Sequence, residues 1–391
     1  MMSPDQRHLQ LPFFDDVHRT LASELAVWVA RQDIDESDDR EACRHWVAAL
    51  GRAGFLRWAV PAAQGGALPA LESRALVVLR ETLSFYSPLA DFAFAMQGLG
   101  SGAITLAGND DQKTNYLVPV GQGEKIAAFA LSEPEAGSDA GALATTAVRN
   151  GGDWTLNGTK TWISNGGIAD YYCLFAKTDS AVGTRGISCF LVDADSPGLD
   201  ASEHIHVMAP HPLATIKLNN CRIPASALLG EENAGLKLAM QTLDIFRPSV
   251  AGAALGFARR ALAEATQHAK SRKMFGHTLA DFQLTQAKLG QMAADVDAAA
   301  LLTYRAAWLR DDAVQRGLST RVTSEAAMAK MVATENAQRV IDAALQLHGG
   351  LGVKVGTKVE SLYRDIRSLR IYEGATEVQQ LIIGKALLIG G

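Results

Sequence analysis

The chain has 391 residues, of which 48% are hydrophobic and 20% are charged, and its formal net charge at pH 7 is -5. Such a length exceeds what one simple core usually supports, so we expect two or three domains. The slightly negative charge gives no electrostatic case for binding nucleic acid or an anionic membrane, and no apolar run is long enough to span a bilayer.

The start of the chain lacks the basic and apolar regions of a secretory signal. The chain has four cysteines, which are scattered without metal-ligand spacing: Cys43, Cys173, Cys189 and Cys221. No cluster of histidine, cysteine and carboxylate residues has the spacing of a zinc site. We therefore expect a cytoplasmic protein with reduced core cysteines and no metal.

Residues 1–120 are expected to form an N-terminal helical domain. Apolar residues recur at helical spacing from Phe13 to Leu25 and from Trp46 to Leu56. Two further helices are expected over residues 71–83 and 92–106, the second ending at Gly108.

The pattern changes to short strands near Gly121, which predicts a middle β domain over residues 121–232. Apolar runs between Gly, Pro and Asp predict strands, which we place at residues 126–131, 171–177, 186–192 and 213–218. The Asn157-Gly158 pair predicts a hairpin turn of type I′.

Residues 233–391 are expected to form a C-terminal bundle of long helices. Apolar patterns of helical period start at Leu236, Leu289 and Met328, and their connectors are short. The expected class is therefore α+β multidomain. A GxGxxG segment that opens a helix after a strand, typical of nicotinamide binding, is absent from the sequence.

Glu373 lies at a predicted joint between a helix over residues 359–370 and a helix over residues 376–388. Gly374 lets the backbone turn freely there, and the flanking Ile371 and Tyr372 favour an apolar setting. Burial would raise the pKa of this carboxyl group and make it a stronger base once ionised. The alternative is an exposed glutamate in a hinge.

Two motifs of the β domain combine small, hydroxylated and aromatic residues. The segment from Phe129 to Gly141 follows a strand and suits a pyrophosphate or the polar edge of a flat heterocycle, or else is an ordinary turn. The segment from Trp162 to Gly167 pairs an aromatic face with a serine, or else holds a core tryptophan.

Two motifs of the helical region end helices. Arg272 to Gly276, followed by Gln283, places an arginine where it can bind phosphate or simply cap a helix. The segment from Gln346 to Gly350 carries His348, which by itself is typical of a core histidine.

Taken together, these segments closely resemble the acyl-CoA dehydrogenase flavoprotein family. The matching motifs follow the family's order and spacing along nearly the whole chain. They include Ser132-Glu133-Pro134 with Ala136 to Asp139, Trp162 to Gly167, Gln346 to Gly350, and Ile371 to Gly374.

The resemblance implies an N-terminal helical domain, a middle β-barrel-like domain, a C-terminal four-helix bundle, FAD and a homotetramer. It implies that FAD meets these residues, some of them from a neighbouring subunit: Phe129, Leu131, Ser132, Ser138, Trp162, Ser164, Arg272, Phe275, Gln283, Gln346, Gly349, Gly350, Thr376 and Glu377. The residues implied to meet the acyl-CoA substrate are Ser138, Asp244, Arg247 and Gly374.

The same resemblance implies the chemistry. Glu373 removes the α-proton of an acyl-CoA thioester, flavin N5 accepts the β-hydride, and the product is a trans-2-enoyl-CoA. Electrons then pass to electron-transferring flavoprotein. Some relatives carry the base on the helix that opens the bundle, but that position is Phe246 here, and phenylalanine takes no proton.

Three alternatives are an acyl-CoA oxidase or a flavin monooxygenase of the same fold, and a non-catalytic scaffold that binds acyl-CoA or flavin. Glu373 counts against a monooxygenase, and the intact motif set counts against a scaffold. The loop from Met208 to Thr215 departs from the family by its two prolines and its missing arginine, so substrate contacts there are not carried over.

Overall fold

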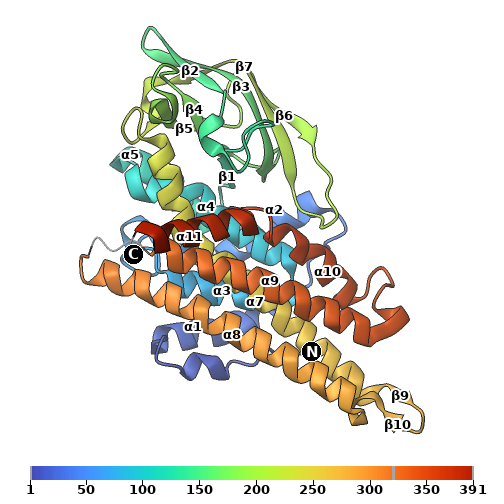
Figure 1. The fold of residues 1–391 in the computed structure, drawn as a ribbon. Coiled ribbons are helices and arrows are strands. Elements are labelled where there is room, and N and C mark those ends of the chain that lie inside the picture. Colours follow the sequence, from blue (N-terminus) through green and yellow to red (C-terminus); the bar gives the residue numbers. More distant parts are fainter. Residues whose placement is uncertain (1, 319–321, 390–391) are drawn as a thin grey trace. The chain divides into compact units, whose positions relative to one another are not determined.

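The computed structural model describes residues 2–318 and 322–389, shown in Figure 1. The chain divides into two compact units. The helical unit consists of the described residues of Met1–Gln32, Glu72–Asp91 and Asp244–Gly391. The sheet unit consists of Asp33–Leu71 and Phe92–Leu243. The N-terminal helices are thus shared between the two units.

Long helices build the helical unit, and α9 contacts α8, α10 and α11. Helix α3 contacts both α1 and α8. The helices that lie wholly in this unit are α1 (Asp16–Val29), α3 (Ser73–Tyr86), α8 (Gln283–Gln315), α9 (Thr323–His348), α10 (Lys358–Leu369) and α11 (Thr376–Ile389). Helices α4 (Pro88–Ala107) and α7 (Gly235–Ser271) contribute residues to both units.

Two glycines let α7 approach α3 closely. A Cβ atom on Gly252 would lie 2.8 Å from the Val77 carbonyl oxygen, and one on Gly256 would lie 1.9 Å from Ser84 Oγ. Both distances are shorter than the closest approach of two non-bonded atoms, so any larger residue would push the two helices apart. These glycines therefore set the spacing of the helices that carry Arg80 and Arg247.

An eight-stranded sheet dominates the sheet unit, with the order β6-β7-β3-β2-β4-β5-β8, and β1 pairs with β4 in parallel. Its strands are β1 (Ala127–Ala130), β2 (Thr146–Asn150), β3 (Asp153–Ser164), β4 (Tyr171–Lys177), β5 (Ile187–Asp193), β6 (Leu199–His204), β7 (Leu213–Pro224) and β8 (Leu228–Leu229). Three helices also belong to this unit: α2 (Asp39–Arg52), α5 (Asp110–Gln112) and α6 (Val118–Gln122).

The predicted hairpin turn at Asn157-Gly158 is wrong. β3 runs straight through these residues, because it pairs with β2 on one side and with β7 on the other. Gly158 instead marks a shift in the β3–β7 register, where a Cβ atom would lie 2.4 Å from Thr145 Oγ1. The turn between β2 and β3 lies at Gly151-Gly152.

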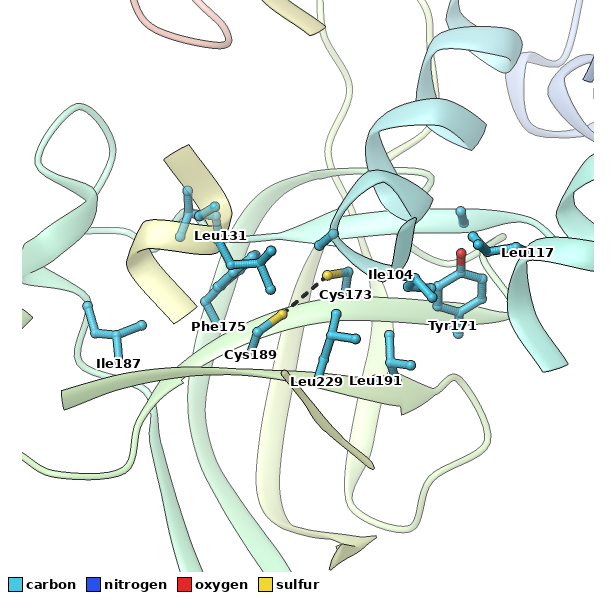
Figure 2. Packing of buried hydrophobic residues seen from close by; sticks show 14 of the residues in the cluster. Ile104, Leu117, Leu131, Tyr171, Cys173, Phe175, Ile187, Cys189, Leu191 and Leu229 are labelled. Carbon is cyan, nitrogen blue, oxygen red and sulfur yellow. Dashed lines mark hydrogen bonds between the residues drawn. The ribbon is translucent and has the colours of Figure 1, made fainter. Parts of the chain in front are cut away.

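Aromatic and aliphatic side chains from β4, β5 and the end of α4 form the core of the sheet unit, shown in Figure 2. Tyr171 and Phe175 are fully buried in it. Cys173 Sγ and Cys189 Sγ lie 3.4 Å apart, and all four cysteines are unpaired and buried, as the sequence predicted.

The order of elements confirms the expected architecture of N-terminal helices, a middle β region and C-terminal helices. Strands β2 and β6 were missed, because most of their residues are exposed and polar and give no apolar run. Among the described residues, none of the helices has the length and apolar character needed to cross a membrane. Domain boundaries at residues 120 and 232 stay a prediction.

Candidate functional site

The joint that carries Glu373 is six residues long and joins the end of α10 to the start of α11. Glu373 adopts φ +53° and Gly374 adopts φ +95°, both in the left-handed region. This conformation costs a residue with a Cβ atom about 1–2 kcal/mol. A strained glutamate persists only where the surrounding contacts fix it, and such strain is typical of functional sites.

Three side chains fix this joint by donating hydrogen bonds to two successive carbonyl groups. Gln379 Nε2 donates to the carbonyls of Glu373, at 3.2 Å, and Gly374, at 2.9 Å. Arg247 Nε donates to the Glu373 carbonyl at 3.5 Å, and Lys330 Nζ donates to the Gly374 carbonyl at 2.8 Å. Side chains from α7, α9 and α11 therefore stabilise the strained backbone conformation of Glu373.

The Glu373 side chain carries a buried oxygen, Oε2, that has no hydrogen-bond partner among the described residues. Burial raises the pKa of this carboxyl group, and the positive charges of Arg80, Lys330 and Arg247 oppose the rise. An unpartnered carboxylate oxygen in a dry setting is the state that a general base requires. One carboxylate oxygen is therefore buried, as the sequence predicted, while Glu373 as a whole is half-buried.

A buried ion pair contributes to the field around Glu373. Arg80 Nε and Nη2 donate to the two carboxylate oxygens of Asp91 at 2.8 and 2.9 Å, and Nη1 donates to Ser249 Oγ at 3.2 Å. Bidentate geometry of this kind fixes both partners. Burial also raises the pKa of the neighbouring Tyr372 phenol, which keeps it uncharged.

Two more predicted site residues, Asp244 and Thr376, lie beside the joint. Asp244 Oδ1 accepts a hydrogen bond from Arg247 Nη1 at 2.6 Å, and Asp244 Oδ2 accepts one from Thr323 Oγ1 at 2.9 Å. Glu335 Oε1 accepts hydrogen bonds from Thr376 Oγ1 and from Arg370 Nε at 2.6 and 2.8 Å. The Thr376 hydroxyl is thus committed to a contact within the chain.

A second group of predicted residues gathers at helix ends of the same unit. His268 on α7 and His348 on α9 stack with ring centroids 4.3 Å apart, which brings Arg272 and the segment from Gln346 to Gly350 to neighbouring ends. Phe275 lies in the turn between β9 (Lys273–Met274) and β10 (His277–Thr278). Its ring is 84% exposed and its φ is +50°.

Gln283 begins α8 close to that turn, since the preceding Phe282 contacts the rings of Phe275 and His277. A Cβ atom on Gly276, Gly349 or Gly350 would meet no atom within 4 Å. Exposed aromatic surface beside open glycine backbone leaves space for a planar ring and its phosphates to approach.

The predicted residues of the sheet unit meet where the loop after β1 lies against β3. Thr161 N donates to the Ser132 carbonyl at 3.0 Å. Lys160 Nζ donates to the Leu131 carbonyl at 3.1 Å and to Glu133 Oε1 at 2.7 Å. Ser132 and Leu131 are therefore held by the residues one and two positions before Trp162.

Trp162 presents its ring to solvent, with 59% of its surface exposed and φ +59°. Ser164 is half-buried two residues further on, and Ser138 is exposed. Phe129 differs, because its ring packs against Phe175 at 5.0 Å. An exposed, strained tryptophan beside serines fits a stacked heterocycle, so these residues suit the flavin that the sequence resemblance implies.

Sequence reasoning missed the arginine that anchors this corner. Arg40 Nη1 donates to the Gly166 carbonyl at 2.8 Å and Nη2 to the Leu213 carbonyl at 2.7 Å. It thereby joins the turn after Trp162 to the end of the loop that departs from the family. In that loop His211 packs on Phe92 at 4.8 Å.

Lys330 and Arg80 were also missed, although a signal was present. Lys330 follows Ala326 by four residues and precedes Ala337 by seven, so it falls on the buried stripe of α9. Arg80 follows Leu76 by four residues and precedes Leu83 by three on α3. A charged residue on an apolar stripe indicates either a buried ion pair or a functional site.

Comparisons with known proteins cover nearly the whole chain. Family models match in succession the acyl-CoA dehydrogenase N-terminal domain at residues 8–124, the middle domain at 128–221 and the C-terminal domain at 233–388. The 3-(aryl)acrylate reductase of Clostridium sporogenes is 40% identical over 384 residues, covering 96% of this chain and 100% of that protein.

Two further similarities bear on cofactor and reaction. The caffeyl-CoA reductase-Etf complex subunit CarC of Acetobacterium woodii is 40% identical over 342 residues, covering 87% of this chain and 88% of that protein. A solved acyl-CoA dehydrogenase complexed with FAD from Bacillus anthracis has a TM-score of 0.87 and 31% identity, covering 96% of this chain and 67% of that chain.

The chain therefore belongs to the acyl-CoA dehydrogenase family, whose members are oxidoreductases that act on CH–CH groups. Its cofactor is FAD, as in the solved relative.

Proposed function

We propose that this chain catalyses the α,β-dehydrogenation of an acyl-CoA thioester to the trans-2-enoyl-CoA, with Glu373 as the base. The observation that carries the proposal is the buried oxygen Oε2 of Glu373, which has no hydrogen-bond partner in the described part of the chain and lies at a strained joint. A weakly acidic α-hydrogen requires a desolvated base that nearby groups keep in place. FAD, when bound, supplies the acceptor for the β-hydrogen, which leaves as a hydride to N5.

The residues of the chain have separate tasks in this proposal. Glu373 takes the α-proton, and its own backbone N–H together with Gly374 meets the thioester. Asp244 and Arg247 meet the CoA arm, which is supported by their position beside the joint. Ser138 is proposed to serve both substrate and cofactor.

The proposed FAD contacts fall into one group in each unit. In the sheet unit the proposed contacts are Phe129, Leu131, Ser132, Ser138, Trp162 and Ser164. In the helical unit they are Arg272, Phe275, Gln283, Gln346, Gly349, Gly350, Thr376 and Glu377. Exposure of the Trp162 and Phe275 rings supports both groups.

We also propose a homotetramer that passes electrons to electron-transferring flavoprotein. Large exposed apolar side chains near helix ends support assembly, among them Leu284, Val355 and Leu388. The name of the Acetobacterium woodii relative places that protein in an Etf complex, which supports the electron acceptor. Light scattering tests the assembly, and anaerobic electron transfer to purified electron-transferring flavoprotein tests the acceptor.

The experiment is anaerobic bleaching of the bound flavin by a panel of straight, branched, cyclic and aryl acyl-CoAs. We expect at least one to bleach the wild type, and Glu373→Gln to keep FAD while losing at least ~10³-fold of the reduction rate, because the base is removed. Unchanged reduction in that variant refutes the role of Glu373. Oxygen consumption with hydrogen peroxide release would instead indicate an oxidase.

A second candidate function is the reverse reaction on an aryl-substituted enoyl thioester. Two relatives at 40% identity are named as reductases of an aryl acrylate and of caffeyl-CoA. In this direction a protonated Glu373 delivers the α-proton, and its raised pKa favours the protonated form. Anaerobic reoxidation of photoreduced enzyme by cinnamoyl-CoA, faster than by crotonyl-CoA, is the result expected of such a reductase.

A further inference from the structure

Lys330 is a buried cation without a counter-ion in contact. Its side chain is 0% exposed, and among the described residues it makes no ion pair with a carboxylate. A buried ammonium group is costly unless it is compensated. Two other buried cations of the same unit do contact carboxylates: Arg80 contacts Asp91, and Arg74 contacts Asp311.

Within residues 2–318 and 322–389, Lys330 Nζ donates one hydrogen bond, to the Gly374 carbonyl at 2.8 Å. That carbonyl already accepts a hydrogen bond from Gln379 Nε2 at 2.9 Å. A neutral amide thus shares this carbonyl with Lys330, and a second neutral donor in place of Lys330 would hold it at lower desolvation cost. What Lys330 adds beyond a donor is its charge.

The carboxylate nearest in sequence to that carbonyl is that of Glu373, the residue before Gly374. Its Oε2 is buried, and no donor in the described ranges makes a hydrogen bond to it. Apart from burial, the largest influence on the pKa of Lys330 is the negative charge of Glu373, and Lys330 in turn opposes the rise in the pKa of Glu373. Burial lowers the pKa of Lys330 to about 8, so the group still carries its proton at neutral pH.

We propose that Lys330 is a positioning residue for the reaction, holding the Gly374 carbonyl so that Glu373 keeps its strained conformation and keeping the Glu373 carboxylate ionised by its charge. This inference rests on the proposed function, because it assigns Lys330 a role only through Glu373 as the base.

The other charged groups around this pair are fixed by the fold. Lys330 also faces Arg247 from α7, Glu335 from α9 and Glu377 from α11. Glu373 also faces Arg80 from α3, Asp91 from α4 and Arg247 from α7. Because these groups remain in a Lys330 variant, the loss of one positive charge is the change that Glu373 experiences.

The test is the pH dependence of anaerobic flavin reduction in single turnover. The rate rises with pH as the base ionises, and we call this rising part of the pH–rate profile the acid limb. Removal of a neighbouring positive charge raises the pKa of the base and therefore moves the acid limb to higher pH. We expect Lys330→Gln to move the limb by at least ~0.5 pH unit, which lowers the rate on the limb at least ~3-fold. Lys330→Arg keeps the charge and is expected to leave the limb near its wild-type position.

Gln379→Met is the matched control, because it removes the other donor to the Gly374 carbonyl without changing any charge. We expect it to lower the rate at every pH and to leave the limb in place. An acid limb that does not move in Lys330→Gln, or that moves equally in Lys330→Arg, overturns the inference. Unchanged reduction in Glu373→Gln defeats the proposed function instead, so the two failures are distinguishable.

Folding supplies a second readout that does not depend on activity. If Lys330→Gln alone fails to fold, the double variant with Glu373→Gln removes both charges together. Recovery of folded protein in the double variant, measured by its thermal midpoint, supports the inference because the two charges then compensate each other. A double variant that also fails to fold overturns it.

Discussion

Removal of the Lys160 charge is expected to destabilise the sheet unit strongly. Lys160 is 0% exposed and donates to Glu133 Oε1 at 2.7 Å. Removing one partner of a buried pair costs about 3–5 kcal/mol, because the other charge is left uncompensated. Glu133 keeps two backbone donors, the amides of Ala144 and Thr145 at 2.6 and 3.1 Å, so we place Lys160→Met near the lower end, at ~3 kcal/mol.

The assay is urea denaturation of FAD-depleted protein, followed by near-ultraviolet circular dichroism. Lys217→Met on the neighbouring strand is the matched control, since its ion pair with Glu203 is 2.7 Å long but about half exposed. Solvent and salt screen an exposed pair of this kind, so its loss is expected to change stability much less than the loss of the buried pair. Equal losses in the two variants contradict the argument from burial.

The same reasoning predicts that a second change rescues part of the loss. Glu133→Gln added to Lys160→Met removes the orphaned charge, and the double variant is expected to be more stable than Lys160→Met alone. Because this pair holds the Leu131 carbonyl beside Trp162, FAD affinity should weaken in Lys160→Met and stay near normal in Lys217→Met.

Two further predictions concern the joint. Gly374→Ala is expected to cost about 1–3 kcal/mol and to slow flavin reduction, because its φ is +95° and its Cβ atom would lie 2.4 Å from Gln379 Nε2; a thermal midpoint equal to wild type contradicts this. Glu373→Gln is expected to be more stable than wild type at pH 7, because the folded-state pKa of Glu373 is raised and ionisation costs folding free energy as pH rises through it. This advantage should vanish below about pH 4, where the carboxyl is protonated in both states, and its persistence there would show that the charge is not the cause.

The sequence alone was sufficient to predict the order of the helical and β regions along the chain. Apolar periodicity predicted the helices on both sides of Glu373, and the structure has α10 at Lys358–Leu369 and α11 at Thr376–Ile389. Period and turn residues are local properties, so they can be read without knowing what the segment packs against. Spaced motifs likewise indicated the family, which the family models then showed.

Local signals failed where a partner distant in sequence decided the outcome. Asn157-Gly158 favours a turn, but pairing with two neighbouring strands keeps β3 extended through it. The hairpin turn lies instead at Gly151-Gly152. Another two-residue turn lies at Phe275-Gly276, both with positive φ, where a bulky exposed phenylalanine gave no such signal.

The sequence by itself determined that a glutamate would stand at a helix joint, because Gly374 follows a helical pattern and lets the chain turn. Only the tertiary structure decided that this glutamate is strained and has a buried carboxylate oxygen, with three cations acting on it. Those cations, Arg80, Arg247 and Lys330, come from three different helices. Electrostatic fields and carbonyl contacts depend on distance in space, and the spacing of residues along one helix does not specify what another helix brings to it.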